Sequence, residues 1–206
     1  MRIISVVGAR PNFMKIAPIM AEISKYSDIL RHELVHTGQH YDYQMSQVFF
    51  EQLNLSETDV YLGVGSGSHA QQTADIMVAF EKVILEKDPD LVLVVGDVNS
   101  TLACALVASK LNVLVAHVEA GLRSFDRKMP EEINRVLTDQ ISNYLFVTES
   151  SAIKNLKREG VDPNKIHFVG NVMIDTLLDF RNQAQELAAY QDYDLAPRGY
   201  GLLTLH

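Results

Sequence analysis

A run of five apolar residues, Leu91 to Val95, most strongly constrains what this chain can fold into. Side chains of a strand point alternately to two faces, so an unbroken apolar strand is typical of the centre of a parallel sheet covered on both sides. Other short runs rich in apolar residues alternate with segments of helical periodicity, which predicts an α/β parallel sheet with right-handed crossovers. These runs are Ile3–Val7, Glu33–His36, Val60–Leu62, Val113–Val118, Tyr144–Val147 and Ile166–Val169.

The segments between these runs predict helices. Ala70–Glu86 is the clearest, because Ile76, Phe80, Val83 and Ile84 fall on one helical face. The other expected helices are Phe13–Tyr26, Tyr43–Leu53, Ser100–Lys110, Pro130–Ile141, Ser150–Glu159 and Met173–Tyr190.

The end of the chain breaks this rhythm. Residues 1–190 are expected to form one domain, and residues 191–199 are polar, contain Pro197 and Gly199, and are typical of a linker. Residues 200–206 resemble the first strand of a second domain, of which nothing more is present.

Composition narrows the class of protein. The 206 residues carry a formal net charge of −8, which argues against broad binding to nucleic acid or an anionic membrane. The single cysteine, Cys104, excludes a disulfide framework and is expected to be a buried apolar filler. No apolar run approaches the roughly 20 residues of a membrane span, and the start of the chain lacks a secretory signal pattern. We therefore expect a soluble cytoplasmic protein.

Glycine and polar residues gather after the predicted strands, where open α/β sheets bind their ligands. Arg10 and Lys15 flank the first such turn and suit an anion at the start of a helix. The other turns hold Thr37–His40, Gly63–His69, Gly96–Thr101, His117–Ser124 and Gly170–Asn171.

These residues also have structural interpretations. Gly8 and Gly96 suit tight turns, and His117 suits a hydrogen-bonded core position. Helix caps are an equal alternative for Asp97, Asn99 and Ser100, while Glu119 and Glu131 can be solvated loop carboxylates.

Two familiar motifs are rejected. The dinucleotide fingerprint G-x-G-x-x-G does not follow the first strand, so an ordinary NAD-binding fold is not expected. His32 to His36 reads H-E-x-x-H, but it lies on a predicted strand. There the two histidines would be ~13 Å apart, too far to share one zinc ion.

Five motifs in order carry a family resemblance. They are Gly8-x-Arg10-Pro11, Gly96-Asp97 with Ser100-Thr101, His117-Val118-Glu119-Ala120-Gly121-Leu122-Arg123, Pro130-Glu131-Glu132-x-Asn134-Arg135 and Gly170-Asn171-x-x-x-Asp175. This set resembles the non-hydrolysing UDP-N-acetylglucosamine 2-epimerases over essentially the whole chain.

The resemblance implies a fold and an activity. The fold would be a Rossmann-like first domain of a glycosyltransferase-B-type two-domain fold, truncated near the start of the second domain. The activity would interconvert UDP-N-acetylglucosamine and UDP-N-acetylmannosamine by eliminating and re-adding UDP, with no redox cofactor or metal. Without the second domain, this chain alone is expected to be inactive. The open alternatives are an epimerase for a related diacetamido-uronate nucleotide sugar and a glycosyltransferase of the same fold.

The resemblance also implies site residues and a homodimer. Catalytic roles fall on Asp97, Glu119, Glu131 and His206. Substrate-binding roles fall on Arg10, Lys15, Arg123, Arg135 and Asn171, and part of an allosteric effector site on Gln39 and His40. Asn12 stands where many members have Glu, so no acid/base role is expected for it. The missing arginine between Gly63 and Met77 argues against allosteric activation.

Overall fold

The computed structural model describes residues 1–38, 53 and 58–203, without the side chain of Arg10. Within these residues a parallel sheet has the strand order β3-β2-β1-β4-β5-β6-β7. The strands are β1 (Arg2–Val7), β2 (Arg31–His36), β3 (Val60–Tyr61), β4 (Leu91–Val95), β5 (Leu114–Val118), β6 (Tyr144–Val147) and β7 (Ile166–Phe168). The predicted α/β class is confirmed, and the predicted bounds of β4 and β6 are those observed.

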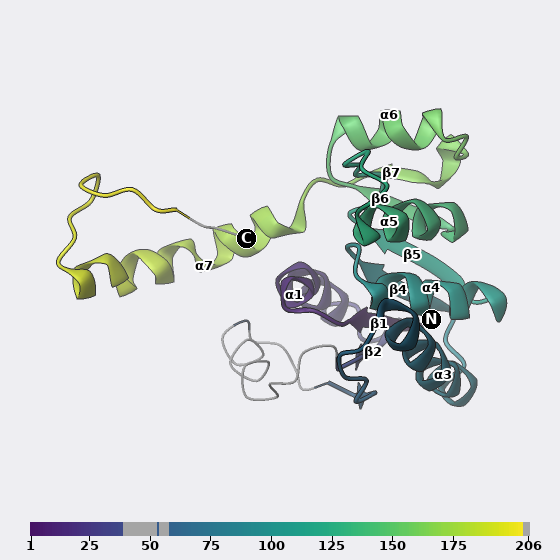
Figure 1. Cartoon of the computed structure of the whole chain (residues 1–206). Helices are drawn as coiled ribbons and strands as arrows, with labels where there is room; N and C mark the ends of the chain where they lie inside the picture. The colour runs from purple at the N-terminus through teal and green to yellow at the C-terminus, as the bar shows by residue number, and fades with distance from the viewer. Residues whose placement is uncertain (39–52, 54–57, 204–206) are drawn as a thin grey trace.

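Helices cover both faces of the sheet (Figure 1). They are α1 (Arg10–Ser24), α3 (His69–Lys87), α4 (Asn99–Lys110), α5 (Pro130–Ile141), α6 (Ser150–Arg158) and α7 (Val172–Leu187), with short 3-10 turns η1 (Pro163–Lys165) and η2 (Ala189–Tyr193). None of the helices in the described part of the chain combines the length and apolar character needed to cross a membrane.

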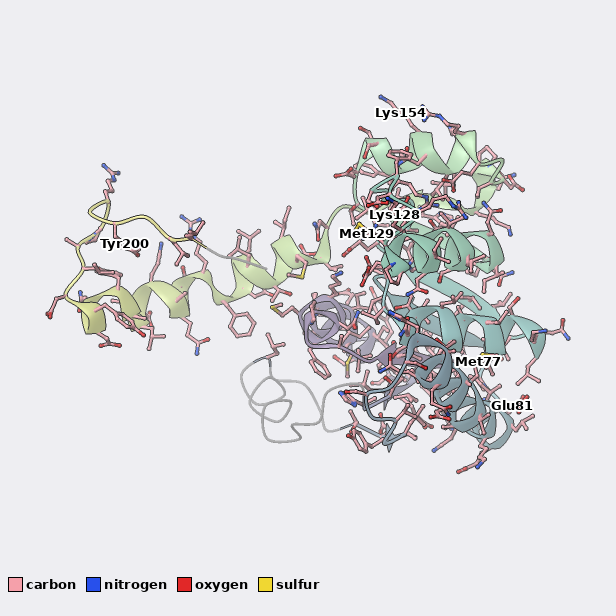
Figure 2. All side chains as sticks on the ribbon, viewed as in Figure 1. Met77, Glu81, Lys128, Met129, Lys154 and Tyr200 are labelled. Atoms are coloured by element: carbon pink, nitrogen blue, oxygen red, sulfur yellow. The ribbon has the colours of Figure 1, made fainter. Side chains whose placement is uncertain are left out.

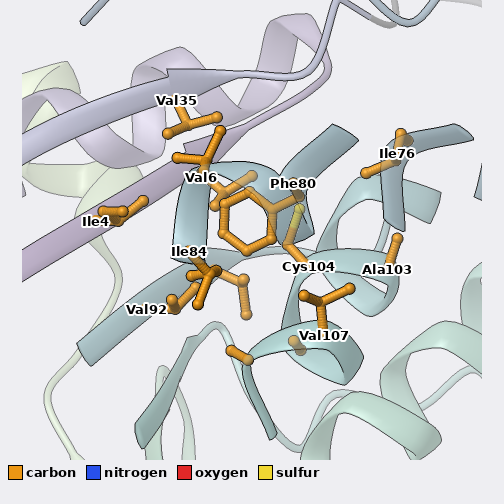
Figure 3. Close-up of a cluster of buried hydrophobic side chains, with 14 of the residues drawn as sticks. Ile4, Val6, Val35, Ile76, Phe80, Ile84, Val92, Ala103, Cys104 and Val107 are labelled. Atoms are coloured by element: carbon orange, nitrogen blue, oxygen red, sulfur yellow. The ribbon is translucent and has the colours of Figure 1, made fainter. Parts of the chain in front are cut away.

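Strand β4 lies at the centre because both of its faces are buried. Val92 and Val94 join one apolar cluster with Phe80 of α3 and Cys104 of α4, as Figure 3 shows for part of that cluster. Leu91, Leu93 and Val95 join a second cluster on the opposite face, with Phe13 and Ile16 of α1. Cys104 is fully buried, so its expected role as an apolar filler is confirmed.

Several predicted boundaries differ from those observed. Helix α1 begins at Arg10 instead of Phe13, because Pro11 suits a first helical turn and Asn12 accepts a hydrogen bond from the backbone N–H of Ala9. Helix α7 ends at Leu187 because Ala188 takes a left-handed conformation with a φ of 45°. The predicted helix Tyr43–Leu53 lies, apart from Leu53, outside the described residues.

The strand expected in residues 200–206 is not formed over the part that is described. Residues 200–203 have no regular structure, and Leu202 and Leu203 are 86% and 77% exposed. A strand needs a neighbour to satisfy its backbone groups, and these residues have none among the described strands. Part of the predicted linker forms η2. The boundary between two domains stays a prediction.

Candidate functional site

At Gly8 the turn after β1 packs closely against the first turn of α4 and the end of β2. A Cβ atom at Gly8 would lie 2.2 Å from Oγ of Ser100 and 2.8 Å from Oγ1 of Thr37. Those two hydroxyls are hydrogen-bonded to each other at 2.8 Å. Gly8 is therefore needed for the close approach of three segments and not for a positive φ. Ser100 lies inside α4 and bonds across to Thr37, so it is not a helix cap.

Asn12 ties the first turn to the end of β4. Its Oδ1 accepts a hydrogen bond from the N–H of Ala9 at 3.0 Å, and its Nδ2 donates one to the carbonyl of Val95 at 2.9 Å. The side chain is buried and both ends of the amide are used. This arrangement gives Asn12 a structural role, consistent with the absence of an expected acid/base role.

Lys15 and Glu119 form an ion pair beside the end of β4. Their Nζ and Oε2 atoms are 2.7 Å apart, and the two side chains are only 12% and 18% exposed. Glu119 stands on a left-handed backbone with a φ of 73°, which is costly for a residue other than glycine. Glu119 is therefore not a freely solvated loop carboxylate, and strain of this kind tends to occur at functional sites.

Asp97 is held by Arg135 of α5. The Nε and Nη2 atoms of Arg135 donate to Oδ2 of Asp97 at 2.9 and 2.5 Å. Nδ2 of Asn134 donates to the backbone carbonyl of Asp97 at 2.9 Å. The residue at the N-cap of α4 is Val98, so neither Asp97 nor Asn99 is the cap. Arg135 thus orients a candidate catalytic carboxylate.

Glu132, which belongs to the fourth sequence motif but was given no role there, is a buried carboxylate. It accepts hydrogen bonds from the backbone N–H groups of Ser124 and Phe125, the hydroxyl of Ser124 and Nη1 of Arg135. Burial raises the pKa of Glu132, but these donors outweigh burial and hold the pKa below its usual range. The available signal was the i,i+3 spacing of Glu132 and Arg135 on one helix.

Glu131 precedes this anchor in the first turn of α5. It is partly exposed, and it makes no hydrogen bond or ion pair with the described residues. The loop leading to it carries the exposed residues Lys128 and Met129, labelled in Figure 2. Glu131 is thus the candidate carboxylate that the described structure leaves unpaired.

Arg123 and Asn171 are placed differently from the other predicted substrate-binding residues. The side chain of Arg123 is 1% exposed, and its Nη2 lies 2.7 Å from Asp139 and 2.6 Å from Glu159. Asn171 caps α7 by accepting a hydrogen bond from the N–H of Met173. Both placements favour structural roles over contact with a substrate.

The H-E-x-x-H motif lies on strand β2, as predicted. Nε2 of His32 is 2.8 Å from Oγ of Ser5, and burial lowers the pKa of His32. The ring of His36 stacks between Phe13 and Tyr61. Over the described ranges no group of three or more His, Cys, Asp or Glu is arranged to hold a metal ion.

Four predicted residues cannot be placed in this site. Gln39, His40 and His206 lie outside the described residues, as does the side chain of Arg10. The structure therefore pairs Lys15 with Glu119 and Arg135 with Asp97 at the carboxyl ends of β4 and β5. Glu131 lies one helical turn before Arg135, at the start of α5.

Comparisons with known proteins find relatives along the whole chain. A family profile described as UDP-N-acetylglucosamine 2-epimerase matches residues 22–206. A UDP-N-acetylglucosamine 2-epimerase homolog from Methanococcus maripaludis is 48% identical over 100% of this chain and 57% of its own length. The UDP-2,3-diacetamido-2,3-dideoxy-D-glucuronate 2-epimerase of Pseudomonas aeruginosa is 47% identical with the same coverage. The chain spans a little more than half the length of these relatives.

The fold is shared with solved structures. A crystal structure of the Methanocaldococcus jannaschii UDP-GlcNAc 2-epimerase, in complex with UDP-GlcNAc and UDP, has a TM-score of 0.89 and 47% identity over 94% of this chain and 53% of that one. The lipopolysaccharide galactosyltransferase WaaB shares the fold alone, at 17% identity and a TM-score of 0.59. The chain has the Rossmann-like architecture of the first domain of a glycosyltransferase-B-type fold. By its sequence and its structure, it belongs to the UDP-N-acetylglucosamine 2-epimerase family.

Proposed function

We propose that this chain supplies the acid/base side of a nucleotide-sugar 2-epimerase that interconverts UDP-N-acetylglucosamine and UDP-N-acetylmannosamine. The observation that carries the proposal is the pairing of Glu119 with Lys15 beside the end of β4, with the Asp97–Arg135 pair nearby. Carboxylates held next to cations at this edge of the sheet suit a reaction that moves a proton and releases an anion. The names of the relatives support the same activity.

The proposed chemistry has two halves. A carboxylate removes the proton from C2 of the sugar while the bond from C1 to the UDP oxygen breaks. UDP leaves with the electron pair, and a double bond forms between C1 and C2. A second acid then protonates C2 on the opposite face, and the UDP oxygen re-forms its bond to C1. Glu119, Glu131 and Asp97 are the candidate acid/base groups.

Lys15 is suited to stabilise the negative charge of the departing diphosphate, because its ammonium already lies at the end of β4 beside Gly96. Arg10 and His206 are assigned the same role by the resemblance alone. Arg135 is committed to Asp97 and Glu132, so we assign it to orienting Asp97 instead of binding the diphosphate.

A second substrate has comparable support. The relative named for the diacetamido-glucuronate sugar is 47% identical to this chain, against 48% for the epimerase homolog. Both sugars require the same proton transfer at C2, so the choice between them would depend on groups that contact the rest of the sugar.

The test uses the chain joined to the residues that follow the matched region in the Methanococcus maripaludis relative, hereafter the two-domain form. UDP-N-acetylglucosamine and UDP-2,3-diacetamido-2,3-dideoxy-D-glucuronate are each incubated with this form in D2O, and each reaction is followed by proton NMR. We expect the 2-epimer to appear together with deuterium at C2. Release of UDP and transfer of the sugar to an added acceptor without deuterium at C2 would instead support the glycosyltransferase alternative.

The resemblance further leads us to propose a homodimer in the cytoplasm. Sedimentation equilibrium of the two-domain form tests the first part, because a monomer over the micromolar range would contradict it.

A further inference from the structure

A buried ionic cluster lies behind the candidate site and, among the described residues, makes no hydrogen bond or ion pair with Lys15, Asp97, Glu119 or Glu131. Its centre is Asp139 of α5, whose side chain is 0% exposed. Asp139 accepts hydrogen bonds from Nδ1 of His117 at 2.7 Å and from the backbone N–H of Gly121 at 3.0 Å, and it pairs with Arg123 at 2.7 Å. One carboxylate therefore gathers three donors from the end of β5 and the loop after it.

His117 carries this contact across to the neighbouring strand. Its Nε2 lies 2.8 Å from the backbone carbonyl of Gly96, which can only accept a hydrogen bond. With a carboxylate on Nδ1 and a carbonyl on Nε2, the ring satisfies both neighbours only when both nitrogens carry hydrogen. The expectation that His117 is a hydrogen-bonded core histidine is confirmed.

The charges of the cluster agree with that arrangement. With hydrogen on both ring nitrogens, His117 would carry one positive charge, and together with Arg123 it would balance the carboxylates of Asp139 and Glu159. Burial raises the pKa of Asp139, but His117 and Arg123 outweigh burial and hold the pKa below its usual range. Asp139 therefore stays an acceptor for all three donors.

The two backbone groups held by the cluster flank the candidate carboxylates. Gly96 immediately precedes Asp97, and Gly121 follows Glu119 by two residues. Gly96 has a φ of 70° and Glu119 a φ of 73°, so both turns use the left-handed region. Such turns keep one geometry only where surrounding contacts fix them.

We propose that His117 and Asp139 are a positioning pair that sets the relative placement of the Asp97 and Glu119 carboxylates. Its catalytic consequence rests on the proposed function, whereas its structural content does not. Asp139 fixes the Glu119 loop through Gly121, and His117 fixes the Asp97 turn through the carbonyl of Gly96.

Two substitutions of His117 separate its two hydrogen bonds, the one to Asp139 and the one to Gly96. In His117→Asn the amide nitrogen can replace Nδ1 toward Asp139 but cannot reach Gly96. In His117→Gln the longer amide can reach the carbonyl of Gly96 in place of Nε2. For the two-domain form we expect His117→Asn to lower kcat by at least about tenfold with KM within about twofold, a loss of roughly 1.4 kcal/mol of transition-state stabilisation. We expect His117→Gln to recover part of that loss.

The control is Ile76→Val, a core truncation on α3 that lowers stability without touching the cluster. If His117→Asn keeps the kcat of the unsubstituted protein, or if all three variants lose activity only in proportion to unfolded protein, the positioning pair is refuted.

A readout in the 206-residue chain itself separates this proposal from the proposed function. Nitrogen-15 NMR is expected to show hydrogen on both ring nitrogens of His117 in the unsubstituted chain, and a ring with one bare nitrogen would overturn the pair. His117→Asn is expected to shift the amide resonance of Asp97 more than that of Gly121, and His117→Gln to do the reverse. If the two-domain form is inactive while this pattern holds, the proposed function fails and the positioning geometry stands.

Discussion

The ammonium of Lys15 lies 2.7 Å from the carboxylate of Glu119, and this ion pair joins helix α1 to the end of β5. In the sheet order β4 lies between β1 and β5, so the pair bridges over the end of the central strand. A Cβ atom at Gly96, the last residue before Asp97, would lie 3.3 Å from the Lys15 nitrogen. The cation is therefore within reach of any anion bound where the polar ends of β1, β4 and β5 converge.

Removing the charge of Glu119 tests whether this carboxylate moves a proton. We predict that Glu119→Gln in the two-domain form lowers kcat by about 10²–10⁴, the usual contribution of general acid/base catalysis, because an amide cannot take the C2 proton. The rate of deuterium incorporation at C2 should fall by the same factor. The matched control is Glu22→Gln, which removes an exposed partner of Lys25 and should leave the rate unchanged. Equal rates for both variants would remove Glu119 from the chemistry.

The left-handed backbone at position 119 should make the protein more stable with glycine there than with alanine. Because a φ of 73° costs a non-glycine residue roughly 1 kcal/mol, Glu119→Gly should be more stable than Glu119→Ala by about that amount. The measurement is urea unfolding of the 206-residue chain. At Glu81, an exposed position inside α3, the order should reverse, because glycine is about 1 kcal/mol worse than alanine in a helix. Equal stabilities of the two Glu119 variants would mean that the turn carries no strain.

Much of the fold follows from local pattern alone. Leu91–Val95 could be placed at the sheet centre because its apolar side chains need cover on both faces, and Pro130 marked the start of α5. The strand order places β4 beside β1, and this pairing depends on contacts between segments far apart in sequence. Residues 200–203 form no strand and have no partner among the described strands, so the expected start of a second domain stays a prediction.

The candidate site could be predicted in residue type but less well in role. Glu131 and Glu132 are adjacent in the sequence, and only the packing of α5 shows that Glu132 turns inward to the loop at Ser124. Arg123 has the charge expected of a phosphate ligand, yet its guanidinium forms ion pairs with Asp139 and Glu159. The partners of a charged side chain lie on other elements, so spacing along the chain does not reveal them.

The buried carboxylate of Glu132 should make stability depend on pH. Its folded pKa lies below the ordinary value of 4.5, so its contribution is fully present above pH 4.5 and is lost as the pH falls through the folded pKa. We predict that Glu132→Gln destabilises the 206-residue chain at pH 7 by about 1–3 kcal/mol, the cost of leaving buried donors poorly paired. The difference in free energy of unfolding between the unsubstituted chain and Glu132→Gln, measured by urea unfolding from pH 7 to pH 3, should become smaller below pH 4.5. A difference that does not change with pH would contradict this account.

Gly8 should tolerate no larger side chain. A Cβ atom there would lie 2.7 Å from Cβ of Ser100, a separation that forces the turn after β1 away from α4. We predict that Gly8→Ala lowers the free energy of unfolding by about 1–3 kcal/mol, as overpacking does elsewhere. The control Gly201→Ala meets no atom within 4 Å and should be neutral. The double variant Gly8→Ala with Ser100→Gly removes Oγ and Cβ of Ser100 but leaves Oγ1 of Thr37 at 2.8 Å, so it should regain only part of the loss. Failure of this rescue would place the cost elsewhere.

The 206-residue chain alone should fold but convert substrate only slowly. It covers 57% of the length of the Methanococcus maripaludis relative and holds the carboxylates of Asp97, Glu119 and Glu131. The proposed proton transfer and release of UDP would then depend on these residues without any group from the rest of that length. In a site formed by this chain alone the departing diphosphate would be exposed to water, where protein charges stabilise it only weakly. We predict that the 206-residue chain converts UDP-N-acetylglucosamine at least about a thousandfold more slowly than the two-domain form, with circular dichroism showing both to be folded. Comparable rates would show that this chain holds the complete catalytic site.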